Sequence, residues 1–80
     1  MPKVYARVLV DAGDELGTAL RKYPKMHGPH EGYAVILEEL DELKAEIWKK
    51  PKKRSLQKMR KEAVQIAAMA LRFMMDVCDK

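Results

Sequence analysis

The stretch that decides the fold is AVQIAAMALRFMM, residues 63–75, in which eleven of thirteen residues are apolar and only Gln65 and Arg72 interrupt the run. A helix that is apolar on nearly all sides has to be buried on nearly all sides. The rest of an 80-residue chain offers two other short helices, which cannot cover this surface fully. The stretch therefore predicts a partner chain, so that homo-oligomerisation of two or more subunits completes a helical bundle.

Three helices are expected, because Pro and Gly residues interrupt the chain twice. The breaks lie at residues 23–29 and at Pro51, which ends a helix at or before Lys50. Residues 30–49 form the clearest helix, and residues 54–78 form another that Ser55 caps. Apolar residues recur at helical spacing along the first of these two: Tyr33, Ile36, Leu40, Leu43 and Ile47.

The first segment, residues 3–22, fits two structures. The β-branched content of residues 4–10 is typical of a strand. The whole segment also fits a helix with one apolar side, although Gly13 and Gly17 weaken that helix by about 1 kcal/mol each relative to alanine. We favour a helix, because a single strand has no partner strand in this sequence. The chain is therefore predicted to be one all-α domain, residues 1–80.

The composition excludes several classes of protein. With 48% apolar and 35% charged residues, the chain is not typical of disorder. One cysteine, Cys78, cannot form an internal disulfide. No apolar run is long enough to span a membrane, and the first ten residues do not resemble a signal peptide. We therefore expect a soluble, cytoplasmic protein with no membrane partner.

The net charge of +4 conceals an acidic block followed by a basic block. Residues 31–48 carry six acids against Lys44 alone, and residues 49–61 carry eight bases and no acid. Such a pattern is consistent with a metal site beside bound phosphate, and equally with two solvated faces.

Several acids have a spacing that suits metal binding. Glu39 and Glu42 are three residues apart and share one face of a helix, at the border of its apolar stripe. Glu62 and Gln65 repeat that spacing on the third helix. Two facing helices with paired oxygen ligands can hold a hard cation such as Mg²⁺. Acids at this spacing are also common on exposed helices, so the spacing alone leaves a solvated face open.

The pattern Glu38-Glu39-x-x-Glu42, followed after nineteen residues by Glu62-x-x-Gln65, resembles the EExxE…ExxD signature of the MazG-like all-α nucleotide pyrophosphohydrolases. The flanking residues 30–34 and 60–73 are similar to those of the small, often phage-borne, members, and the resemblance covers residues 28–77. It implies a MazG-like all-α bundle, a homodimer or homotetramer. It also implies hydrolysis of a nucleoside triphosphate to the monophosphate and pyrophosphate.

The resemblance also implies the roles of individual residues. Glu39, Glu42 and Glu62 would bind Mg²⁺, or Mn²⁺ in its place, and Glu38 would orient or deprotonate the attacking water. Position 65 departs from the signature, because Gln65 stands where the family has Asp and brings no charge. The cations beside the acids that are expected to bind the substrate phosphates are Arg54, Lys58 and Lys61.

Three alternatives to a hydrolase remain. One is a relative that binds nucleotides without catalysis, and another is a passive structural bundle. The third is a small basic helical oligomer that binds nucleic acid through the run of residues 49–54. We expect no nucleic-acid partner, because neither a DNA-binding protein nor a passive bundle needs Glu38, Glu39, Glu42 and Glu62 together.

Overall fold

The computed structural model describes residues 2–80, with side chains from Val4 onward. It contains three α-helices, α1 (Pro2–Lys22), α2 (Pro29–Ile47) and α3 (Leu56–Phe73). A 3-10 turn, η1 (Pro51–Lys53), lies between α2 and α3, and a π-helical turn, η2 (Met74–Cys78), continues α3. Residues 2–80 contain no strand, so the predicted all-α class with three helices is confirmed, including the helix favoured for the first segment.

The helix ends follow from local sequence. Ser55 is the N-cap of α3, and its hydroxyl accepts a hydrogen bond from the backbone N–H of Lys58 at 3.1 Å, as predicted. Pro29 occupies the first turn of α2, where a missing N–H costs nothing. α2 ends at Ile47, two residues earlier than expected, and α3 begins at Leu56, two residues later than expected.

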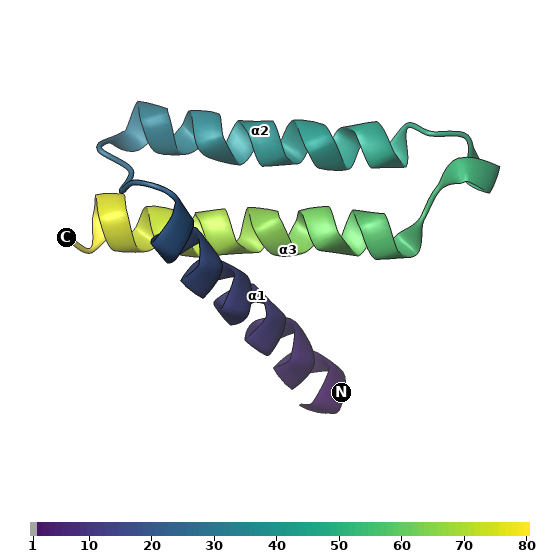
Figure 1. The fold of residues 1–80 in the computed structure, drawn as a ribbon, viewed down its shortest axis with the longest axis horizontal. Helices are drawn as coiled ribbons and strands as arrows, with labels where there is room; N and C mark the ends of the chain where they lie inside the picture. Colours follow the sequence, from purple (N-terminus) through teal and green to yellow (C-terminus); the bar gives the residue numbers. More distant parts are fainter. Residues whose placement is uncertain (1) are drawn as a thin grey trace.

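Helices α2 and α3 run antiparallel and lie side by side, whereas α1 crosses α3 near its C-terminal end and diverges from the pair (Figure 1). The chain measures 43 × 30 × 20 Å along its principal axes. The α2–α3 turn forms one end of the long axis, and the end of α1 meets the other end of the helix pair. The acids of α2 are thereby brought opposite the middle of α3.

The core lies where the end of α1, the start of α2 and the end of α3 meet. Ala19, Met26 and Met69 are buried there, and partly buried apolar side chains pack around them: Val35, Ile36, Phe73 and Val77. Gly32 of α2 allows this close approach, because a Cβ at this position would lie 2.5 Å from the Phe73 ring. The core is small and lies at one end of the helix pair.

Much apolar surface stays exposed in the single chain. Fourteen large apolar side chains among the described residues are exposed, many of them on α1, such as Tyr5 at 67% and Leu9 at 56%. The accessible surface is 6309 Å², whereas a compact monomer of this mass exposes about 4,900 Å². Among residues 2–80, no helix combines the length and the apolar character that crossing a membrane requires.

Candidate metal centre

Three glutamates meet between α2 and α3. Glu39 and Glu42 lie one turn apart on α2, and Glu62 faces them from α3. One carboxylate oxygen of each lies within 4.8 Å of the others. The structure thus brings together three of the four residues that were predicted to be metal ligands, from two helices that are distant in sequence.

The cluster is electrostatically strained. The pKa of Glu39 is raised to about 7, mainly by partial burial and then by the carboxylates of Glu42, Glu62 and Glu38 in that order of effect. Partial burial also raises the pKa of Glu62, and the carboxylate of Glu42 adds to the effect. The cluster therefore holds a proton near neutral pH, because three carboxylates at this separation resist ionising together.

Gln65, the fourth predicted ligand, lies against the same group. With its amide oriented to satisfy its hydrogen bonds, the side-chain nitrogen donates to Glu39 Oε2 at 2.9 Å and to Glu62 Oε1 at 3.1 Å. The side-chain oxygen of the same amide reaches this position if the amide is turned over. Gln65 can thus donate to the carboxylates, or offer a neutral oxygen to a cation.

The donor set fits a hard divalent cation. All four side chains offer oxygen, none offers sulfur or imidazole nitrogen, and the carboxylate oxygens are close enough to share one ion. Mg²⁺ and Mn²⁺ accept such ligands, and Mg²⁺ keeps several waters in its shell. A cation would replace the proton that the raised pKa values keep in the cluster.

A cavity of about 400 Å³ adjoins the cluster, and Glu38, the predicted catalytic acid, lines it together with Glu39 and Glu42. Glu38 is exposed, so its carboxylate is accessible to water. The other lining residues come from the loop after α1, from α2 and from α3: Tyr23, Pro24, Met26, Glu31, Val35, Met69 and Arg72. The cavity combines apolar walls with a carboxylate edge, as a small-molecule site requires.

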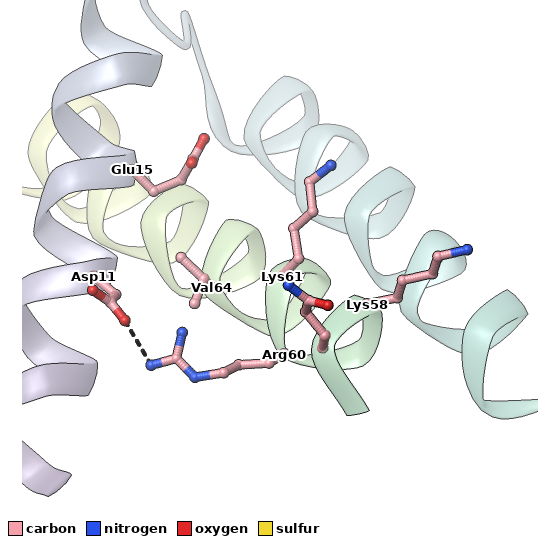
Figure 2. A pocket seen from close by; sticks show the side chains of 7 residues that line it. Asp11, Glu15, Lys58, Arg60, Lys61 and Val64 are labelled. Carbon is pink, nitrogen blue, oxygen red and sulfur yellow. Dashed lines mark hydrogen bonds and ion pairs between the residues drawn. The ribbon is translucent and has the colours of Figure 1, made fainter. Parts of the chain in front are cut away.

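The predicted phosphate-binding cations, Arg54, Lys58 and Lys61, do not converge on one point as the three glutamates do. Lys61 is close enough for its charge to lower the pKa of Glu62 against the raising effects. Lys58 and Lys61 also line a second cavity, of about 520 Å³, between α1 and α3 (Figure 2). In that cavity Arg60 forms an ion pair with Asp11 at 2.6 Å, which Figure 2 marks with a dashed line.

Arg54 has a local role in the structure. Its Nε donates to the carbonyl of Ile47 at 2.8 Å and so caps the C-terminal end of α2. Arg54 lies in the turn between α2 and α3, outside the two helices that carry the cluster.

A buried polar network beside the cavity was not predicted. The Arg72 guanidinium donates to Asp76 Oδ2 at 3.0 Å, to the carbonyl of Ala19 at 2.9 Å and to that of Tyr23 at 3.0 Å. Asp76 also accepts from the backbone N–H of Met26 at 3.0 Å, and this bond is the main reason that the pKa of Asp76 is lowered. Its signal in the sequence is a charged residue inside an apolar run with an opposite charge four residues later.

This network fastens the end of α1 and the following loop to α3, and so forms one wall of the cavity. Asp76 thus serves the fold here.

Comparison of the chain with protein families, with curated proteins and with solved structures finds no match.

Proposed function

We propose that the chain is a Mg²⁺-dependent nucleoside triphosphate pyrophosphohydrolase with a MazG-like fold. The observation that carries the proposal is the convergence of Glu39, Glu42 and Glu62 to within 4.8 Å across two helices. The resemblance of residues 28–77 to the MazG-like enzymes supports the same conclusion. In this proposal the substrates of the enzyme are cytoplasmic nucleotides, so the protein acts in the cytoplasm.

The three glutamates would hold Mg²⁺ or Mn²⁺, with the Gln65 amide oxygen as a neutral fourth ligand. The ion, when bound, offsets phosphate charge and polarises the bond to be broken. Glu38 accepts a proton from the water whose oxygen bonds to the α-phosphorus. The bond from that phosphorus to the bridging oxygen breaks, and pyrophosphate leaves with the electron pair.

The remaining residues of the site bind the substrate and orient it. Lys58, Lys61 and Arg54 precede Glu62 in the sequence, and they neutralise the outer phosphates in this proposal. The cavity of about 400 Å³ beside Glu38 takes the nucleoside, against the apolar side chains of Val35 and Met69. Phosphoryl chemistry asks the protein mainly for such positioning and charge neutralisation.

The active form in this proposal is a homodimer or homotetramer. The single chain exposes about 1,400 Å² more surface than a compact monomer of its mass, the scale that one partner buries in an obligate dimer. The exposed apolar residues of α1 supply part of that surface. Light scattering should give two or four times 9.2 kDa, and a stable monomer at micromolar concentration would contradict this part of the proposal.

The activity test measures pyrophosphate released from a panel of ribo- and deoxyribonucleoside triphosphates with Mg²⁺. Glu42→Ala should lower kcat by about 100-fold or more, because a metal ion contributes several kcal/mol to the transition state. Asp41→Ala is the matched control, since Asp41 is an exposed acid on the same helix outside the cluster. No pyrophosphate from any substrate, or equal rates for the two variants, would end the hydrolase proposal.

A second candidate, nucleotide binding without hydrolysis, is favoured by one observation. Gln65 brings no charge, so the site has one carboxylate fewer than the family signature and should hold Mg²⁺ more weakly. Calorimetric titration with a triphosphate and Mg²⁺ distinguishes the two candidates. Binding without release of pyrophosphate supports a nucleotide-binding protein, whereas binding with turnover supports the enzyme.

A further inference from the structure

The α2–α3 turn and its flanks form a strongly basic end of the molecule. We call residues 48–56 the basic tip: it contains five cations and no acid, namely Lys49, Lys50, Lys52, Lys53 and Arg54. Lys49 pairs with Glu46 at 2.9 Å, and the other four have no acidic partner among the described residues. A convex end with this charge attracts a polyanion.

The basic tip is held in a defined shape. The backbone N–H of Lys53 donates to the carbonyl of Lys50 at 2.7 Å, and that of Arg54 donates to Pro51 at 3.3 Å. The Arg54 side chain closes the turn by donating to Ile47. Neighbouring like charges are thus held together against their repulsion, and of these cations only Lys49 has an acidic partner among the described residues.

Two large apolar side chains are exposed within this cationic end. Trp48 is 72% exposed and Leu56 is 82% exposed, the two highest values among the exposed large apolar side chains. They flank the turn that joins α2 to α3, because Trp48 follows the last residue of α2 and Leu56 is the first residue of α3. Lys44 lies over the Trp48 ring, 5.5 Å from its centroid, so a cation accompanies the aromatic ring as well.

We propose that the basic tip docks the protein on a membrane surface rich in anionic lipids. Trp48 and Leu56 enter the interface between headgroups and acyl chains, where an amphipathic indole is most stable. The surrounding lysines contact the lipid phosphates, and each cation near such a surface strengthens binding about fivefold, which is about 1 kcal/mol. The docking is peripheral and needs no spanning segment, so the expectation of no membrane partner, which rested on the lack of such a segment, does not extend to it. It is independent of the proposed hydrolase.

The surface of the tip favours a membrane over the other polyanions. A single-stranded nucleic acid is usually held in a basic groove with several stacked aromatics. The three main cavities of the described residues are lined by residues outside the tip, and Trp48 is its one aromatic residue. The Leu56 side chain has no hydrogen-bonding or charged group with which to bind a phosphodiester chain. Two facing tips would repel each other, so the tip of a second copy is not the occupant.

Trp48 is the sole tryptophan of the chain, so its fluorescence reports directly on the tip. The full chain is titrated with vesicles of phosphatidylcholine, alone or with about one third phosphatidylglycerol. We expect a blue shift and sedimentation with the anionic vesicles only, both weakened by salt. Lipids brominated on their acyl chains should quench Trp48 when it is inserted.

Matched variants locate the effect. Lys52→Gln with Lys53→Gln should weaken the partition coefficient about 25-fold, or fivefold for each cation. Lys22→Gln with Lys80→Gln removes the same charge from exposed positions outside the tip and should change it less than threefold. Leu56→Ser should reduce the blue shift while sedimentation persists at low salt.

Three results would overturn the proposal. They are equal binding to neutral vesicles, equal weakening by the two lysine pairs, and salt-sensitive retention of an oligonucleotide without any binding to vesicles. The last result would assign the tip to nucleic acid. None of them bears on pyrophosphate release, so failure here is distinguishable from failure of the proposed enzyme.

Discussion

Glu42 should destabilise the ion-free protein and stabilise the ion-bound one. Its carboxylate raises the pKa values of both Glu39 and Glu62, which means that it opposes their ionisation. Glu42→Gln keeps the size of the side chain and removes its charge. Two like-charge contacts are relieved, each worth about 0.5 kcal/mol. The variant should therefore be about 1 kcal/mol more stable in a chelator at pH 8, which raises Tm by about 4–8 °C.

The pH dependence of the stability follows from the same raised pKa of Glu39. The pKa of Glu39 is raised from 4.5 to about 7, so between these values the folded protein holds a proton that the unfolded chain releases. Wild-type stability therefore falls as pH rises through this window, and the loss is complete above it. The advantage of Glu42→Gln should be present at pH 8 and nearly absent at pH 4.5, where Glu39 is largely protonated in both proteins.

Magnesium should cancel the advantage and leave the wild type slightly the more stable protein. At a free Mg²⁺ concentration 100 times the wild-type Kd, binding adds about 2.7 kcal/mol to wild-type stability. If loss of one carboxylate ligand weakens binding tenfold, the variant gains only about 1.4 kcal/mol at the same concentration. The assay is a set of melting curves at fixed protein concentration, with chelator or Mg²⁺, for wild type, Glu42→Gln and the control Asp41→Asn.

The control should show neither the gain in chelator nor the loss of the Mg²⁺ effect, because Asp41 lies outside the cluster. Reasoning from the cluster is refuted if Glu42→Gln is no more stable than wild type at pH 8 without ions. It is equally refuted if Mg²⁺ raises Tm by the same amount in all three proteins.

Three further predictions follow from single contacts. Gly32→Ala drives a Cβ to 2.5 Å from the Phe73 ring and should destabilise the fold by about 1–3 kcal/mol, measured by urea unfolding; an unchanged midpoint would mean that the ring moves freely. Arg72→Ala leaves Asp76 buried and unpaired, which costs about 3–5 kcal/mol, and circular dichroism should show a largely unfolded chain at 25 °C; a native melting curve would contradict this. Gln65→Asp adds a carboxylate and should tighten Mg²⁺ binding about tenfold by calorimetry; weaker binding would count against Gln65 as a ligand position.

The helices were readable from the sequence because their boundaries are set by local chemistry. Pro29, Pro51 and the Ser55 cap act within one turn of their own positions, and the structure bears out each of them. The pairing of Glu39 with Glu42 was equally local. That Glu62 would face them depended on the register of α2 against α3, which the resemblance implied and the spacing alone left open.

The buried ion pair of Arg72 with Asp76 could not be predicted with its partners. Its spacing of four residues is local, but the carbonyls of Ala19 and Tyr23 come from more than 45 residues away. Only the crossing of α1 over α3 decides that these groups meet. The same holds for the cavity beside Glu38, whose walls come from three separate parts of the chain.

Gln65 stabilises the acidic cluster at a position where a further acid would destabilise it. An aspartate at position 65 would add a negative charge to carboxylates whose pKa values are already raised. The amide instead donates to Glu39 and Glu62, which offsets part of their repulsion. Its oxygen takes the same position when the amide turns over, so one neutral side chain can serve both the protonated cluster and a cation. A glutamine at position 65 thus gives a more stable ion-free fold and weaker Mg²⁺ binding than an aspartate would. The opposite changes are expected for Gln65→Asp, which should bind Mg²⁺ more tightly and be less stable in chelator.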